Sequence, residues 1–180
     1  MTFCTMIMGT NGVGKSTLAR TIMQRLGGIQ TYANEISYLS DGESFFLGKY
    51  AGVKLGGVDY INETKKLAQI ARKGLETHKN CFMEGRYVNT ISQYLLNVLF
   101  SFDRQLVVLL YLPEDKIRER IIQRTGVFKG DMPYILKAQK TAMNAMVKYK
   151  AMGVPILCIN TSEISPDDIA DKILTYIKNI

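Results

Sequence analysis

The sequence predicts an α/β fold in which a mainly parallel sheet of five strands carries helices on both faces. Short apolar runs alternate with segments of helical periodicity, a pattern that produces right-handed strand–helix–strand units. The run at residues 106–112 is continuously apolar, as expected of a strand that is buried on both faces. A glycine-rich turn joins the first predicted strand, residues 2–8, to the first predicted helix, residues 15–26. No linker or internal repeat is visible, so we expect a single domain over residues 1–180.

The glycine-rich turn matches G-x-x-x-x-G-K-[ST] without substitution, which is the P-loop motif. Its glycines let successive backbone N–H groups point inward around a phosphate, and the following helix adds the positive end of its dipole. Lys15 is expected to reach the β- and γ-phosphates of ATP, and the Ser16 hydroxyl to ligate Mg²⁺. The motif therefore predicts a three-layer P-loop NTPase fold. The residues expected to bind the nucleotide are Gly9, Thr10, Asn11, Gly12, Val13, Gly14, Lys15, Ser16 and Thr17.

Two other classes of P-loop protein are disfavoured because their motifs are missing. A switch GTPase would carry Asn-Lys-x-Asp or Thr-Lys-x-Asp to read guanine, and the sequence contains neither. The absence of a guanine-reading motif also favours ATP as the phosphate donor. A motor ATPase would usually carry an apolar run that ends in two acids, and a longer chain. A small kinase is the class that remains.

A carboxylate follows the strand that is predicted at residues 81–83. Glu84 stands at the carboxyl end of this strand, and Gly85 and Arg86 come next. An α/β nucleotide-binding fold places its metal-associated acid or its base at this position, so Glu84 is a candidate for both roles. The alternative is a purely electrostatic role at the start of the helix predicted over residues 88–100.

The segment after the first helix has a different character. Asp41-Gly42 lies between short β-like runs and predicts a hairpin, and a glycine-rich loop then leads to Asp59. We expect the hairpin and the loop, residues 36–60, to lie on the acceptor side of the site, because glycine lets the backbone approach a ligand closely. A flexible surface loop is the alternative. Asp59 or Asn62 is expected to cap the helix that follows.

The second half of the chain resembles the small P-loop kinases of nucleosides and nucleoside monophosphates. In that family a helix with an Arg-Ile-x-x-Arg pattern leads into a mobile lid. Here the pattern starts at Arg120 and ends at Arg124, and the implied lid spans residues 120–131. The family also has a strand that ends in acid-x-Arg and supplies a carboxylate and an arginine to the acceptor. Glu84 and Arg86 stand in those places.

The resemblance implies ATP-dependent transfer of the γ-phosphate to a nucleoside or nucleotide. Lys15, Arg120 and Arg124 would surround the transferring phosphoryl group with positive charge, and a closing lid would exclude water. The alternative for Arg120 is a solvated helix face, where it would pair with Glu114 and Glu119.

Part of the glycine-rich loop points to a different acceptor. Gly48-Lys49-Tyr50 and Gly56-Gly57-Val58-Asp59 look like elements of bacteriophage P-loop kinases that phosphorylate 5-hydroxymethyluridine within DNA. That looser resemblance implies a DNA substrate, with Tyr50 stacked on an extruded base. A net charge of +7, a pI near 9.3 and a lysine-rich helix at residues 133–152 would favour such a polyanion through counterion release.

The choice of the catalytic base stays open at this stage. Asp59 or Glu84 would accept the proton of an attacking hydroxyl or position it, while the other could hold Mg²⁺ through water. A phosphate acceptor would need no base. A hypothesis from another class is a binding module that uses ATP to order its loop on DNA without transferring phosphate.

Composition sets the remaining expectations. The apolar run at residues 3–8 is too short for a signal peptide or a membrane span, so we expect a cytoplasmic protein without a membrane partner, in the host cytoplasm if the protein comes from a phage. The three cysteines, Cys4, Cys81 and Cys158, fall in predicted strands and are expected in the core. The oligomeric state is open, with a homodimer as one option.

Overall fold

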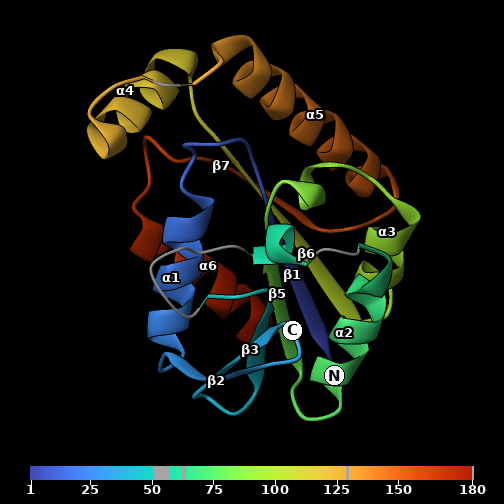
Figure 1. The fold of residues 1–180 in the computed structure, drawn as a ribbon. Coiled ribbons are helices and arrows are strands. Elements are labelled where there is room, and N and C mark those ends of the chain that lie inside the picture. Colours follow the sequence, from blue (N-terminus) through green and yellow to red (C-terminus); the bar gives the residue numbers. More distant parts are fainter. Residues whose placement is uncertain (51–56, 62–63, 129, 180) are drawn as a thin grey trace.

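The computed structural model describes residues 1–50, 57–61, 64–128 and 130–179 (Figure 1). The strands are β1 (Phe3–Met8), β2 (Ile29–Ala33), β3 (Ile36–Leu39), β4 (Ser44–Leu47), β5 (Asn80–Glu84), β6 (Arg104–Tyr111) and β7 (Ile156–Asn160). The α-helices are α1 (Lys15–Arg25), α2 (Leu67–Leu75), α3 (Gln93–Leu99), α4 (Glu114–Thr125), α5 (Met132–Ala151) and α6 (Pro166–Lys178). Three short 3₁₀ helices are η1 (Gly57–Tyr60), η2 (Thr64–Lys66) and η3 (Tyr87–Asn89). Among the described helices, none has the length and hydrophobicity needed to cross a membrane.

The sheet has seven strands in the order β2-β3-β4-β5-β1-β6-β7. Strands β4, β5, β1, β6 and β7 run parallel, which confirms a mainly parallel α/β sheet. The predicted number of five strands is wrong, because β2 and β3 extend the same sheet as antiparallel strands. Their connecting turn places Asn34 and Glu35 at φ 52° and 63°. Such a turn usually carries glycine at one of these positions, so the sequence signal for this hairpin was weak.

The hairpin predicted at Asp41-Gly42 is confirmed and joins β3 to β4. The Asp41 carboxylate accepts hydrogen bonds from the backbone N–H of Ser44 at 2.9 Å and of Glu43 at 3.1 Å. These bonds fix the turn, as aspartate does at the first position of many turns. They also align β3 with β4, which explains how the hairpin stays in the plane of the main sheet.

Two predicted helices are shorter than expected. The helix expected after Asp59 begins as the 3₁₀ segments η1 and η2 before α2, and its other candidate cap, Asn62, lies outside the described residues. The helix expected over residues 88–100 divides into η3 and α3, because Ser92 adopts an extended backbone and caps α3 by accepting from the Leu95 N–H at 3.3 Å. Both breaks lie near the edge where the parallel strands end.

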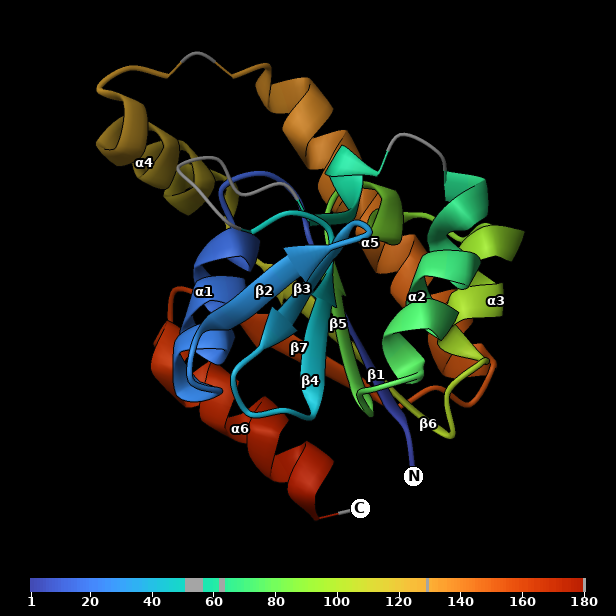
Figure 2. The ribbon, with the colours of Figure 1, turned by 60° about the horizontal axis from the view of Figure 1, so that its bottom comes forward.

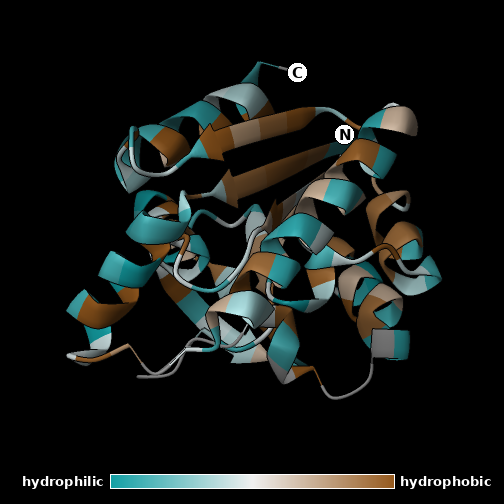
Figure 3. Ribbon diagram, turned by 90° about the horizontal axis from the view of Figure 1, so that it is seen from above, coloured by the Kyte–Doolittle hydropathy of each residue, from teal (hydrophilic) through white to brown (hydrophobic). Residues whose placement is uncertain are grey.

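Helices cover both faces of the sheet, as Figures 1 and 2 show. Helices α1 and α6 pack on one face, where Leu18 and Ile173 join a buried cluster with strand residues. Helices α2, α3 and α5 pack on the other face, where the cluster includes Tyr149. Hydrophobic residues run along the strands between helices that also carry hydrophilic residues (Figure 3). The core therefore consists of two apolar layers separated by the sheet.

The cysteine prediction holds for two of the three residues. Cys4 and Cys81 are buried and face each other in the register of β1 and β5. Cys158 is exposed, so its expected place in the core is wrong. It lies on β7, which is an edge strand and pairs with β6 on one side only.

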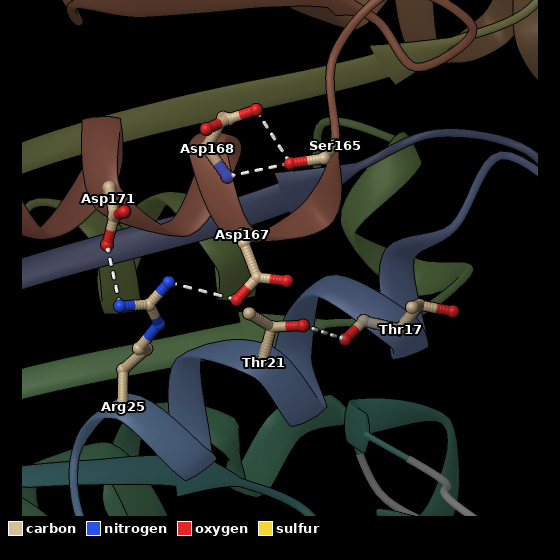
Figure 4. A network of polar contacts seen from close by, with 7 residues as sticks. All are labelled: Thr17, Thr21, Arg25, Ser165, Asp167, Asp168 and Asp171. Carbon is tan, nitrogen blue, oxygen red and sulfur yellow. Dashed lines mark hydrogen bonds and ion pairs between the residues drawn. The ribbon is translucent and has the colours of Figure 1, made fainter.

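Arg25 links α1 to α6 on the surface (Figure 4). Its guanidinium lies 3.0 Å from Asp167 and 3.5 Å from Asp171, and all three side chains are exposed. We expect Arg25→Ala to lower the free energy of unfolding by less than about 1 kcal/mol, because solvent screens exposed ion pairs. Urea unfolding measures this change in the free energy of unfolding.

Ser165→Ala should lower the free energy of unfolding by about 1 kcal/mol, because Ser165 accepts from the Asp168 N–H at 3.1 Å and caps α6. A larger loss in Arg25→Ala than in Ser165→Ala would contradict both expectations.

Candidate active site

The P-loop lies at the edge of the sheet where the parallel strands end. Gly12 and Gly14 have φ values of 85° and 101°, which only glycine adopts without strain. A Cβ on Gly9 would lie 2.5 Å from the Leu110 carbonyl oxygen, so the chain needs glycine there as well. A cavity of about 530 Å³, which we call the P-loop cavity, opens at this loop. All the residues of the motif that follow Gly9 line it: Thr10, Asn11, Gly12, Val13, Gly14, Lys15, Ser16 and Thr17.

Asn89 anchors the start of the loop, a role that the sequence analysis missed. Its side chain is buried and makes two hydrogen bonds with the backbone of Gly9. Asn89 Oδ1 accepts from Gly9 N–H at 2.8 Å, and Asn89 Nδ2 donates to the Gly9 carbonyl at 2.9 Å. One residue further on, the Thr10 hydroxyl donates to the carbonyl of Ile135 in α5 at 2.9 Å. The loop is therefore fixed from η3 and from α5.

We expect Asn89→Ala to lower the free energy of unfolding by about 2 kcal/mol or more, because it leaves a buried N–H and a buried carbonyl of Gly9 without their partner. Thermal and urea unfolding measure the loss. Asn97→Ala is the matched control, since Asn97 is exposed and its side chain accepts from Gln93 in the same helix at 2.8 Å. That variant should stay within about 0.5 kcal/mol of the unmodified protein. Equal losses in the two variants would contradict the anchoring role.

A buried lysine and a buried carboxylate come together beneath the P-loop. Glu84 ends β5 and pairs in register with Ile7 of β1, just before the loop that carries Lys15. Lys15 Nζ donates to the Thr10 carbonyl at 2.9 Å. Burial lowers the pKa of Lys15, and the negative charge of Glu84 opposes this effect. Burial likewise raises the pKa of Glu84, and the charge of Lys15 opposes it. The structure thus places these two predicted residues within electrostatic reach of each other.

Tyr50 and Gly57 enclose Glu84 from the side of the glycine-rich loop. The Tyr50 hydroxyl donates to Glu84 Oε1 at 3.3 Å, and its ring packs on Phe46 with centroids 5.0 Å apart. Tyr50 is only 3% exposed, so the expectation that it stacks on an extruded base is wrong for this conformation. A Cβ on Gly57 would collide with the Glu84 carbonyl and lie 2.8 Å from Glu84 Oε1. Glycine here lets the backbone approach Glu84; the central part of the glycine-rich loop, residues 51–56, lies outside the described residues.

Asp59 holds the turn that follows β5. Its Oδ1 accepts from the backbone N–H of Arg86 at 2.7 Å and of Tyr87 at 3.3 Å, and its Oδ2 lies 3.5 Å from Arg86 Nε. The charge of Asp59 raises the pKa of Arg86. Both oxygens of Asp59 are therefore engaged in positioning Arg86.

Arg120 and Arg124 line the P-loop cavity from α4. Arg120 Nη1 donates to Thr161 Oγ1 at 2.9 Å and approaches the Val13 carbonyl at 3.4 Å, and its Nη2 bonds to the Thr161 carbonyl. Thr161, which the sequence analysis did not single out, also donates to Val13 at 3.0 Å. Arg120 thus connects the P-loop to the segment after β7. After α4 the chain folds back so that Phe128 lies against Arg118 at 4.7 Å, and residue 129 of the expected lid lies outside the described residues.

Ser16 and Glu84 were predicted to hold Mg²⁺, and their chemistry fits that ion. Each offers oxygen, the ligand that Mg²⁺ prefers, and Ser16 lines the P-loop cavity. Within the described ranges there is no group of three or more His, Cys, Asp or Glu side chains suited to a metal. Mg²⁺ commonly takes one or two protein oxygens together with phosphate oxygens and water. Glu84 does not line the P-loop cavity, and one of its oxygens accepts from Tyr50, so the Mg²⁺ role of the two residues stays a prediction.

A comparison with known protein families identifies the family of this chain. The model of a family described as "AAA domain" matches residues 6–127. The chain belongs to this family. In this AAA-domain protein the matched region extends from β1 to the residues just after α4, so it includes the P-loop, Glu84, Asn89 and Arg120. No curated protein sequence matches the chain.

Solved structures share the fold of this AAA-domain protein at low sequence identity. YorR protein from Bacillus subtilis, in complex with phosphorylated GDP, is 15% identical with a TM-score of 0.64, over 97% of this chain and 95% of that one. A sugar kinase from Janibacter sp. is 16% identical with a TM-score of 0.55, over 99% and 95%. Deoxyadenosine kinase from M. mycoides with bound dCTP is 16% identical with a TM-score of 0.52, over 98% and 100%. The fold resembles that of P-loop nucleoside and nucleotide kinases, as predicted, whereas the looser resemblance to phage DNA kinases stays a prediction.

Proposed function

We propose that this protein is an ATP-dependent phosphotransferase that moves the γ-phosphate to a nucleoside or nucleotide acceptor. The observation that supports this proposal most strongly is that buried Lys15 and buried Glu84 lie within electrostatic reach of each other beside the P-loop. A buried cation and a buried carboxylate are costly to keep unless each has a task or a partner. Beside a phosphate-binding loop, the two charges suit phosphoryl transfer.

The P-loop cavity is the proposed site for ATP. Its volume of about 530 Å³ falls in the range of about 300–1,000 Å³ that is usual for small-ligand sites. The loop N–H groups and Lys15 would bind the phosphates, and Arg120 and Arg124 would approach from α4, at the start of the proposed lid. Mg²⁺, when bound, neutralises charge on the β- and γ-phosphates. Ser16 would hold the ion, and Glu84 would join it, directly or through water, where the acceptor needs no base.

In the proposed reaction an acceptor oxygen forms a bond to the γ-phosphorus. The bond from the γ-phosphorus to the β–γ bridging oxygen breaks, and ADP leaves with its electron pair. For a hydroxyl acceptor we assign the role of base to Glu84, because both oxygens of Asp59 already bind the turn at Arg86. Burial raises the pKa of Glu84, which makes the carboxylate a stronger base than an exposed glutamate. Asp59 then acts as a positioning residue for Arg86.

The alternatives to this function are a kinase that phosphorylates DNA and a DNA-binding module that transfers no phosphate. The burial of Tyr50 removes one argument for base capture, while the exposed lysines of α5 still suit a polyanion. The ligands bound in the neighbours, phosphorylated GDP in YorR and dCTP in deoxyadenosine kinase, favour a free nucleotide or nucleoside. We therefore place the free acceptor first.

Transfer of labelled γ-phosphate from ATP tests the proposal. The panel should contain deoxynucleosides, their 5′-monophosphates, and duplex DNA with or without 5-hydroxymethyluracil. Label in a free nucleoside or nucleotide would support the proposal. Label only in the modified DNA would replace it by the DNA kinase alternative, and ATP binding without any transfer would favour the binding module.

A further inference from the structure

Thr161 connects three elements at the rim of the P-loop cavity. It is the first residue after β7 and is only 7% exposed. Its hydroxyl donates to the carbonyl of Val13 in the P-loop at 3.0 Å and accepts from Arg120 Nη1 of α4 at 2.9 Å. Its carbonyl accepts from Arg120 Nη2. This threonine therefore links the end of β7, the P-loop and α4.

The chain holds Thr161 in place from both sides. Its backbone N–H donates to the carbonyl of Tyr111, the last residue of β6, at 3.1 Å. The turn that follows is closed by Asn160, whose Oδ1 accepts from the Ser162 N–H at 3.2 Å and whose Nδ2 donates to Glu163 at 2.6 Å. The carbonyl and the hydroxyl that face Arg120 are therefore anchored to the sheet.

These bonds determine where the Arg120 guanidinium lies. A Cβ on Gly14 would be 3.8 Å from Arg120 Nη1, so the guanidinium lies beside the phosphate-binding turn, and Arg120 lines the P-loop cavity. A guanidinium has five N–H donors. Among the described residues, Thr161 and Val13 engage three of them, which leaves two for a ligand in the cavity.

Arg124, one turn further along α4, is not held in this way. It also lines the P-loop cavity, but it is exposed, and no residue that the structure describes accepts a hydrogen bond from it or pairs with its charge. Its side chain has to be ordered when a ligand binds. Arg120 is already ordered, and a charge that is fixed in advance needs no reorganisation during the reaction.

We propose that Thr161 is a positioning residue that holds the Arg120 guanidinium ready for the phosphates of the donor nucleotide. This inference rests on the proposed function and deepens it, because it makes Arg120 the fixed arginine of the site and Arg124 the one that the ligand orders. The Thr161 hydroxyl is the decisive group. Valine has the same shape and keeps the carbonyl, but it can neither accept from Arg120 nor donate to Val13.

A double-mutant cycle of Thr161→Val and Arg120→Met tests this role, with single-turnover transfer and ATP affinity as the two measurements. Thr161→Val should slow transfer about tenfold or more, because Arg120 loses a charge-assisted bond. Thr161→Ser keeps the hydroxyl and should restore most of the rate. In the Arg120→Met background, Thr161→Val should change the rate less than about twofold, since the residue that it positions is already absent.

Two controls separate positioning from a loss of structure. Thermal unfolding must show that every variant is folded at the assay temperature. Thr175→Val removes the hydroxyl of an exposed threonine in α6 that does not line the P-loop cavity, so this variant should match the unmodified protein.

The outcomes separate this inference from the proposed function. An effect of Thr161→Val that depends on Arg120 supports the inference. Equal slowing with and without Arg120 overturns it, because the hydroxyl would then act through Val13 alone, and unchanged or faster transfer in Thr161→Val overturns it as well. If ATP binds but no acceptor is labelled, the proposed function fails and the cycle in ATP affinity decides the inference: Thr161→Val should weaken ATP binding only while Arg120 is present.

Discussion

Replacing Lys15 by methionine is expected to slow transfer of the γ-phosphate about a thousandfold or more, because a preorganised charge at the transferring group is lost. Methionine has a similar length and no charge, and the side chain of Lys15 is almost fully buried. The P-loop should therefore keep its shape. Single-turnover transfer with ATP in excess measures the effect on the chemical step.

Unfolding and ATP binding provide the controls for Lys15→Met. Lys15→Met also removes the hydrogen bond to the Thr10 carbonyl, so thermal unfolding must show that the variant is folded at the assay temperature before a loss of activity is assigned to the lost charge. Lys172→Gln, which removes an exposed positive charge from α6, is the control for the change in net charge. Transfer by Lys15→Met within tenfold of the normal rate would contradict the role of the P-loop lysine.

Replacing Glu84 by glutamine is expected to slow transfer to a hydroxyl acceptor about a hundredfold to ten-thousandfold, the usual contribution of a general base. The glutamine amide can still accept the hydrogen bond from Tyr50, so the surroundings should persist. ATP binding should be retained. Glu43→Gln is the control, because Glu43 is an exposed carboxylate that pairs with Lys79 at 3.2 Å. A larger loss in Asp59→Asn than in Glu84→Gln would exchange the roles that we assign to the two acids.

The same pair of residues predicts the pH dependence of kcat/KM. With a hydroxyl acceptor, Glu84 must be ionised to act as a base, so activity falls as pH drops through its pKa. Because burial raises that pKa, the acid limb should lie above the range of an ordinary glutamate. Lys15 must be protonated, and because burial lowers its pKa, the alkaline limb should lie below the range of an ordinary lysine. Glu84→Gln should abolish the acid limb alone; an unchanged profile would show that another group titrates.

The parts of the fold and site that could be predicted from the sequence have local signals. The P-loop follows from spacing within nine consecutive residues, Gly9 to Thr17, and Glu84 from its position at the end of an apolar run. The parallel strands follow from apolar runs that alternate with helices. Because the carboxyl ends of parallel strands meet at one edge, the closeness of Lys15 and Glu84 could be expected as well.

The parts that could not be predicted depend on contacts between distant residues. Asn89 binds Gly9 across 80 positions of the chain, and Thr161 reaches Val13 across 148. No spacing rule connects such pairs. Base stacking by Tyr50 was predicted from the looser resemblance to phage DNA kinases, but its ring packs on Phe46, and only the tertiary structure reveals that contact.

Thr10 connects Lys15 of the P-loop to α5 through two hydrogen bonds. Its carbonyl accepts from Lys15, and its hydroxyl donates to Ile135, so any movement of α5 relative to the P-loop must strain or break one of these bonds. Thermodynamic linkage is reciprocal, which means that an acceptor that shifts Thr10 alters the affinity for ATP by the same factor as ATP alters the affinity for that acceptor. A ligand that displaces α5 from Thr10 would therefore also disturb the residue whose carbonyl holds Lys15.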